Sequence, residues 1–249
     1  MKIYLSIVNT RTILALVVSV LVSYITLFFK FNYNYDLALI SIAIIFPLVF
    51  TIRSAFRRRE KALEYLSRFK AGLQTVHHYI QESNKLDDVK KEEAKTILKN
   101  IPPVLVDYLR SKTKTKEEVA EEIKKVATFM RVNDEYIGNG TASRVYRFMK
   151  DVYESFENVV AINQHRTPIA IRAYCLIFIY LYPVIYTPAL YNRLHDGISF
   201  HDSWILFALS AISTFILISL YNVQDQMEHP FDQHGLDDIQ LTSFTLDNL

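Results

Sequence analysis

Residues 37–52 read LALISIAIIFPLVFTI and carry no charge, whereas residues 53–61, which follow directly, read RSAFRRREK and include five Lys or Arg. A long apolar run that ends in a basic cluster is typical of a membrane-spanning helix with its basic end in the cytoplasm. Beyond the cluster, apolar side chains recur at helical spacing without a proline. We therefore expect one helix from Leu37 to Ser83, about 70 Å long at 1.5 Å per residue.

Three further uncharged runs have the length of a membrane span. They contain 18, 20 and 22 residues, at Thr12–Phe29, Ala173–Asn192 and Ser203–Gln224. A helix needs about 20 mostly apolar residues to cross the hydrocarbon core of a bilayer. Buried helices of a soluble core are the alternative, but four such runs in 249 residues exceed what one core needs. The sequence predicts an all-α, polytopic membrane protein with four transmembrane helices and a helical cytoplasmic domain.

The composition excludes several other classes of protein. Aromatic residues make up 13% of the chain, which excludes low-complexity disorder, and five glycines are too few for a collagen-like repeat. Cys175 is the single cysteine, so the chain has no internal disulfide and no cysteine-based zinc or redox motif. The first apolar run is followed by Phe28-Phe29-Lys30-Phe31 instead of a small-residue cleavage site. We therefore interpret this run as a retained span and not as a signal peptide.

The distribution of charge predicts the topology. Segment 53–167 holds 23 of the 28 basic and 17 of the 26 acidic residues, whereas the connection between the last two spans holds one arginine and two aspartates. Because basic residues stay on the cytoplasmic side, we expect both termini and this segment in the cytoplasm, and the protein in the cell (inner) membrane. The expected parts are transmembrane helices 1 and 2 at 1–52, a cytoplasmic helical domain at 53–167, transmembrane helices 3 and 4 at 168–222, and an acidic cytoplasmic tail at 223–249.

Helix signals divide the cytoplasmic domain further. After the long helix, the expected helices are Val89–Asn100, Val104–Leu109, Thr115–Arg131 and Ala142–Asn163. The first of these should end before the Pro102-Pro103 pair. Thr115 and Glu118 have the spacing of a capping box at the start of the third helix. A Gly138-Asn139-Gly140 turn should precede the fourth.

No set of residues with the spacing of an active site is visible. His77 and His78 are adjacent, so they point to different faces of a helix, and the sequence has no glycine-rich phosphate loop. The basic run at 57–59 could contact nucleic acid or lipid headgroups, but beside a membrane span it is the ordinary positive-inside anchor. We therefore expect membrane lipid as a partner, no nucleic acid, no cofactor and no enzymatic activity.

The acidic tail offers one metal hypothesis. Asp232, Asp237 and Asp238, together with His229 and His234, could bind a hard cation through oxygen ligands. The fixed ligand spacing of an EF-hand loop is absent, so a solvated acidic loop is the preferred interpretation. No metal site is predicted.

The second span has an unusual pattern. Ile42, Phe46 and Phe50 recur at intervals of four, which places them on one stripe of a helix. Pro47 lies in the same stretch and removes the helical hydrogen bond to the carbonyl of Ala43. A helix kinked in this way is tolerated where it faces protein or a water-filled cavity. A packing kink with a bulky lipid-facing or core-facing stripe is the alternative.

Three segments in order resemble the bestrophin family, and in particular its bacterial-type members. They are the second span followed by TIRSAFRRREKALEYLSRF at residues 51–69, then HRTPIAIRAYCLIFIYLYPV at 165–184 with Thr167 and Pro168, and QMEHPFDQHGLDDIQL at 226–241 with Glu228, Pro230 and Phe231. The middle segment is similar to a family Thr-Pro-x-Pro element, although its second proline is absent. The last is similar to a family Glu-Asn-Pro-Phe-Gly segment, with His229 and Asp232 in place of Asn and Gly.

The resemblance implies a homopentameric ion channel whose second helices line a central pore. By position, Ile42, Phe46 and Phe50 would match the family's hydrophobic neck, with five copies of each forming apolar rings that can close by dewetting. Phenyl edges carry partial positive charge, and the cytoplasmic segment has a formal excess of six positive charges, so both favour chloride or another small anion. The tail lacks the dense acidic run of calcium-gated members, so we expect calcium to alter gating little.

Two readings stay open beside the passive anion channel. A non-conducting membrane protein could use its cytoplasmic helices to recruit a partner or sense lipid, and bacterial-type relatives could prefer cations. The four uncharged runs contain no ionisable acid or base of the kind that an ion-driven carrier more often places within its spans. This absence favours a passive pore or a non-transporting protein over a pump.

Overall fold

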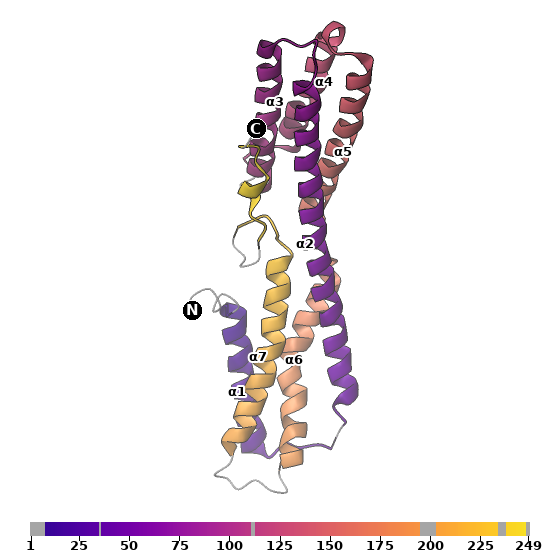
Figure 1. The fold of residues 1–249 in the computed structure, drawn as a ribbon. Coiled ribbons are helices and arrows are strands. Elements are labelled where there is room, and N and C mark those ends of the chain that lie inside the picture. Colours follow the sequence, from indigo (N-terminus) through magenta and orange to yellow (C-terminus); the bar gives the residue numbers. More distant parts are fainter. Residues whose placement is uncertain (1–7, 35, 111–112, 195–202, 234–237, 248–249) are drawn as a thin grey trace. The chain divides into compact units, whose positions relative to one another are not determined.

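The computed structural model describes residues 8–34, 36–110, 113–194, 203–233 and 238–247, and within these ranges it is helical and contains no β-strand. The α-helices are α1 (Thr10–Phe29), α2 (Ala38–Gln81), α3 (Asp88–Arg110), α4 (Lys116–Val132), α5 (Asn139–Gln164), α6 (Ile169–Leu194) and α7 (Ser203–Met227), with short 3-10 helices η2 (Asp134–Tyr136) and η4 (Leu241–Phe244) (Figure 1). The predicted all-α class is confirmed.

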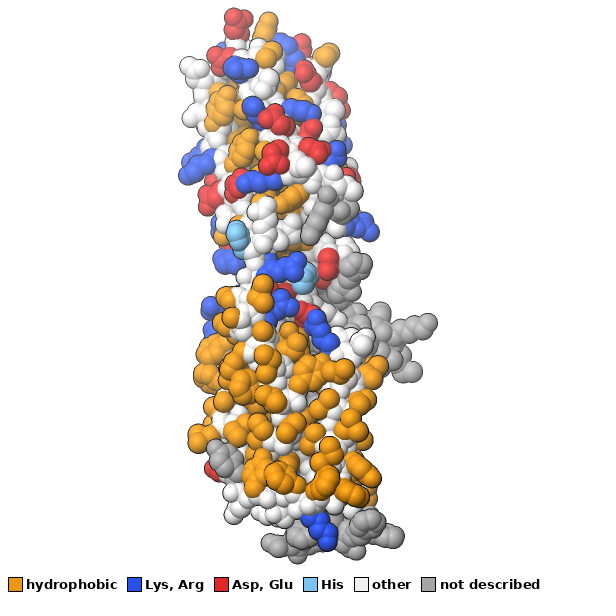
Figure 2. Space-filling model, turned by 180° about the vertical axis from the view of Figure 1, so that it is seen from behind, with side chains coloured by type: hydrophobic (Ala, Val, Ile, Leu, Met, Phe, Trp, Pro, Cys, Tyr) orange, Lys and Arg blue, Asp and Glu red, His pale blue; other side chains and the backbone are white. Residues whose placement is uncertain are grey.

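The chain divides into two compact units. Residues Met1–Arg57 and Thr167–Glu228 form the first, here called the membrane unit, and residues Arg58–Arg166 and His229–Leu249 form the second, here called the polar unit. Helix α2 runs unbroken from the first unit into the second, as the sequence predicted. Hydrophobic side chains cover the visible face of the membrane unit, whereas Lys, Arg, Asp and Glu cover that of the polar unit (Figure 2).

The membrane unit contains four helices that are long and apolar enough to cross a bilayer: α1, α2, α6 and α7. Helix α1 packs against α6 and α7 through a stripe of small residues, all buried: Thr12, Ala15, Ser19, Ser23 and Thr26. Its large apolar side chains point outward instead. Small residues let membrane helices approach closely. Lipid tails are as apolar as the large side chains, so burying those side chains between helices brings no hydrophobic gain. This is an integral membrane protein, as predicted.

Polar side chains join the membrane helices to one another. The Ser210 hydroxyl on α7 lies 2.9 Å from that of Ser19 on α1 and 2.7 Å from that of Thr187 on α6. Nearer the N-terminus of α1, the Asn222 side chain donates to the Thr12 hydroxyl over 2.9 Å. In hydrocarbon each such pair satisfies groups that water cannot reach, so these contacts fix the register of the three helices.

The second half of α2 packs with α3, α4 and α5 around the core of the polar unit (Figure 1). The core includes Leu66, Phe69 and Leu73 from α2, and the predicted apolar face of α5 also contributes to it. Helix α4 begins with the predicted capping box: the Glu118 backbone N–H donates to the Thr115 hydroxyl over 3.3 Å, and the Thr115 N–H donates to the Glu118 carboxylate over 3.4 Å.

Two expectations for the polar unit were wrong. Helix α3 does not end before Pro102 but runs through both prolines to Arg110, because Leu98, Ile101, Leu105 and Leu109 form one continuous buried stripe. Residues 138–140 are not a turn between helices, since α5 already begins at Asn139 with Gly138 as its N-cap. Glycine is accepted at an N-cap position, so Gly138 can begin this helix instead of forming a turn before it.

The described part of the tail belongs to the polar unit. Phe231, Ile239, Leu241 and Leu246 are buried in its core. The Ile239 N–H donates to the Pro230 carbonyl over 2.9 Å, and Lys70 on α2 donates to the Ser243 carbonyl over 2.7 Å. The apolar residues of the tail thus anchor it to the helices despite its acidic composition.

Candidate pore-lining helix

Helix α2 presents two different faces within the membrane unit. Ile44, Leu48 and Thr51 are buried, and the two aliphatic side chains join a cluster with Cys175 and Ile179 of α6. The predicted neck residues lie on the opposite face, where Ile42 is 58% exposed, Phe46 60% and Phe50 54%. They are therefore not part of the packing of a single subunit. The Phe46 and Phe50 rings meet edge to face, with centroids 4.9 Å apart and planes at 84°.

Pro47 lies inside α2 without ending it. Proline has no N–H, so the carbonyl of Ala43, one turn earlier, has no helical donor. The hydroxyl of Tyr174 on α6 donates to this carbonyl over 3.4 Å. This hydrogen bond joins α2 to α6 one turn before the proline. Nothing in the local sequence of Tyr174 distinguishes it from the other span tyrosines, so its contact was not predictable.

The Thr-Pro and Glu-x-Pro-Phe segments meet in part. Glu228, at the end of α7, is buried, and its carboxylate accepts hydrogen bonds from the Thr167 hydroxyl, from the Thr167 N–H over 3.3 Å and from the Gln224 side chain over 3.3 Å. Pro168 directly precedes α6, and its carbonyl accepts from the Ile171 N–H over 3.2 Å. The structure thus gives Thr167 and Glu228 a shared role in joining the start of α6 to the end of α7.

A second ionic contact joins the same helices and α1. Asp225 on α7 accepts from the guanidinium of Arg172 on α6 and, over 2.8 Å, from that of Arg11 just inside α1. Charges at the end of an apolar helix are stabilised by such pairing. This cluster was not predicted, although each of the three helices has one isolated charge directly beside its apolar run, which is a signal in the sequence.

The metal hypothesis finds no support in the residues that the structure describes. They contain no group of three or more His, Cys, Asp or Glu side chains able to hold a metal ion. Asp232 and Asp238 lie within the described ranges, whereas Asp237 and His234 lie outside them.

The basic cluster of α2 divides by face. Arg58 donates to the backbone carbonyls of Ile162 and His165, and so caps the C-terminal end of α5 within the polar unit. Arg53 and Arg57 are exposed instead. Lys and Arg side chains commonly bind the free carbonyls at a helix end, so the role of Arg58 is structural.

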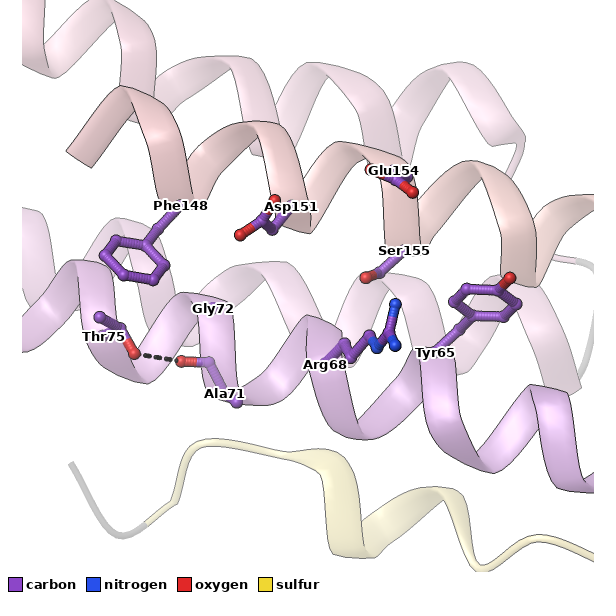
Figure 3. Close-up of a pocket in the computed structure, with 9 residues that line it drawn as sticks. All are labelled: Tyr65, Arg68, Ala71, Gly72, Thr75, Phe148, Asp151, Glu154 and Ser155. Carbon is purple, nitrogen blue, oxygen red and sulfur yellow. Dashed lines mark hydrogen bonds between the residues drawn. The ribbon is translucent and has the colours of Figure 1, made fainter. Parts of the chain in front are cut away.

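A cavity of about 350 Å³ lies between α2 and α5 in the polar unit. Its lining residues are Tyr65, Arg68, Ala71, Gly72, Thr75, Phe148, Asp151, Glu154 and Ser155 (Figure 3). A Cβ atom on Gly72 would lie 2.7 Å from Val152 Cγ2, so the two helices touch at this point. Arg68 is paired with Glu64 over 2.7 Å. The lining contains no histidine or cysteine.

Shifted pKa values occur in the polar unit as parts of structural contacts. The hydrogen bond from Lys114 lowers the pKa of Glu118 beside the capping box. Burial lowers the pKa of His77, and the positive charge of Lys95 adds to the effect. Neither group lines the cavity between α2 and α5.

Solved structures with the same fold are membrane proteins. A bacterial bestrophin homologue from Klebsiella pneumoniae superimposes with a TM-score of 0.74, at 15% sequence identity, over 94% of this chain and 93% of its own. This chain has the bestrophin fold. A mutant of the Klebsiella protein matches with a TM-score of 0.76 over 94% and 95% of the two chains, and another structure described as a membrane protein with 0.77 over 95% of each, both at 15% identity. No family model matches the sequence, and no curated protein matches it.

The likeness to bestrophins predicted from three short segments is confirmed at the level of the fold. At 15% identity the fold is retained while most side chains differ. The roles of individual residues in this chain therefore have to be inferred from the contacts within its own structure and not from the solved structures.

Proposed function

We propose that five copies of this chain form an ion channel that passes chloride or another small anion passively through a hydrophobic neck. Ile42, Phe46 and Phe50 would line the neck, and both termini and the polar unit would lie in the cytoplasm. The observation that carries the proposal is the two-faced packing of α2: Ile44, Leu48 and Thr51 are buried in the subunit, whereas the stripe of Ile42, Phe46 and Phe50 is left uncovered.

The physical basis is the chemistry of the uncovered stripe. Apolar rings around an axis exclude water when the pore is narrow and pass ions when it widens. Aromatic edges can accompany a partly dehydrated anion, because the edge of a phenyl ring carries partial positive charge. Such a pore needs no reacting group and no cofactor, which fits a non-enzymatic protein.

Anion flux into liposomes tests this function. Purified protein should support flux, and Phe46→Ala or Phe50→Ala should raise it, because a smaller side chain widens and wets the neck. Phe28→Ala is the matched control, since Phe28 on α1 is 68% exposed but lies outside the stripe. Added calcium should change the flux little.

The mass of the assembly in mild detergent tests the stoichiometry separately. A pentamer has five times the 29.0 kDa of one chain. Monomers in detergent, together with an absence of flux from wild type and both neck variants, would overturn the channel and favour a protein that recruits a cytoplasmic partner or senses lipid.

A further inference from the structure

The stripe of neck residues continues into two arginines. Successive residues of an α-helix are about 100° apart, so Arg53 and Arg57 each lie within about 20° of the direction of Phe46. Helix α2 is unbroken over this stretch. The exposed line Ile42, Phe46, Phe50 therefore becomes basic within one turn, on the side of the helix that its own subunit leaves uncovered.

The neighbouring basic residues are placed differently. Arg58 lies about 120° from Phe46 around the helix and caps α5, and Arg59 lies about 140° away in the other direction. Arg53 and Arg57 take part in no hydrogen bond or ion pair with any residue that the structure describes. Two of the four arginines in the cluster are thus free to act on a solute.

We infer that Arg53 and Arg57 form basic rings at the cytoplasmic end of the neck and make the channel select anions over cations. This inference rests on the proposed channel function. A pentamer would bring ten guanidinium groups to the mouth of an apolar constriction, where low-dielectric walls concentrate the field. Arginine stays charged at every physiological pH, so the selectivity should not depend on a titration.

The same two residues could instead anchor α2 at lipid headgroups, as basic residues beside a span commonly do. The two roles predict different effects on the charge selectivity of the pore. An anchor affects insertion and stability but leaves the charge selectivity of the pore unchanged, whereas a ring in the pore sets the ratio of anion to cation permeability.

The reversal potential of the reconstituted full-length protein under a sodium chloride gradient measures that ratio. Wild type should be anion-selective, and Arg53→Gln with Arg57→Gln should lower the permeability ratio about tenfold, in line with the size of focusing effects in charged clefts. Arg53→Glu with Arg57→Glu should reverse the preference. Arg59→Gln is the matched control, because it removes the same charge from another face of α2 and should leave the reversal potential unchanged.

A measurement on wild type alone guards against variants that fail to assemble. Its anion preference should weaken as salt rises from roughly 0.05 to 1 M, because the Debye length falls over this range from more than about 10 Å to about 3 Å. Two results would contradict the role given to Arg53 and Arg57 but not the channel itself. In one, wild type conducts and the double Gln variant has the same reversal potential. In the other, wild type conducts but prefers cations. A wild type without conductance overturns the channel itself.

Discussion

The hydroxyl of Tyr174 on α6 donates to the carbonyl of Ala43 on α2, the acceptor that Pro47 leaves without its helical donor. This relationship explains how a proline can sit inside α2 while the helix stays packed. Removing the hydroxyl with Tyr174→Phe should lower the free energy of unfolding in detergent by about 0.6 kcal/mol, the average for interhelical hydrogen bonds in membranes.

A double-mutant cycle isolates the contribution. In Pro47→Ala the backbone N–H of residue 47 returns and can bond to the Ala43 carbonyl, so Tyr174→Phe should cost little in that background. Equal losses in both backgrounds would show that the hydroxyl contributes independently of the carbonyl that Pro47 leaves without a donor, and no loss in either would show that Tyr174 acts by ring packing alone. Its contact with Phe178, with ring centroids 4.4 Å apart, is present in both.

The carboxylate of Glu228 gives a second prediction. Glu228→Gln places an amide where three donors converge, so at least one donor is left facing another. Buried hydrogen bonds to a charged group contribute about 1.5–3 kcal/mol each, so the variant should lose about 2 kcal/mol of unfolding free energy. Thr167→Val removes one of these donors and should cost about 1.5 kcal/mol, the lower end of the same range.

The two changes should not add, because they remove the same contact. Glu60→Gln provides the control, since Glu60 is an exposed carboxylate that shares no hydrogen bond or ion pair with the described residues. Losses from Glu228→Gln no larger than those from Glu60→Gln would contradict the role given to the buried carboxylate.

Much of the fold was predictable because the signals are local. Apolar runs of span length mark α1, α6 and α7, and the absence of proline between residues 53 and 84 predicted that α2 leaves the membrane unit without a break. The Thr115–Glu118 capping box lies within four residues of chain, so its geometry follows from its spacing. The small residues of α1 also recur at intervals of three and four, a local pattern that marks its packed face.

The rest depends on partners far apart in the chain. Thr167 and Glu228 were both identified from short segments, yet nothing in either segment says that they bond to each other across 61 residues. The Ser19–Ser210–Thr187 contact is of the same kind. At Pro102 the local rule predicted an end, and the buried stripe from Leu98 to Leu109 overrode it. Long-range packing therefore decided these three features.

The close approach of α2 and α5 at Gly72 gives a third prediction. Alanine is a better helix former than glycine by about 1 kcal/mol, but its Cβ would lie 2.7 Å from Val152 Cγ2. Val152 is buried and β-branched, so it cannot rotate away freely. Overpacking costs about 1–3 kcal/mol, so Gly72→Ala should lower the stability of the polar unit on balance.

Shortening the neighbour tests the cause. In a Val152→Ala background the clash is gone, and Gly72→Ala should then be stabilising through helix propensity. The sign of the Gly72→Ala effect should therefore differ between the two backgrounds, as measured by denaturant unfolding followed by helical circular dichroism. The same sign in both backgrounds would place the strain elsewhere.

Burial and the nearby Lys95, His78 and Lys99 lower the pKa of His77 below its ordinary 6.5, and only Glu92 opposes them. Its Nδ1 atom is buried without a hydrogen-bond partner. The folded protein therefore keeps His77 neutral at a pH where the unfolded chain takes up a proton. The stabilisation is complete above about pH 6.5 and is lost as the pH falls below it, toward the lower folded pKa.

Unfolding midpoints of the full chain at pH 7.5 and 5.5 should differ less in His77→Gln than in wild type. His78→Gln at the adjacent position is the matched control and should keep most of the wild-type difference, because the His78 side chain is exposed and its charge is one of the smaller causes of the lowered pKa of His77. A His77→Gln variant with the full wild-type difference would assign the pH dependence to other groups.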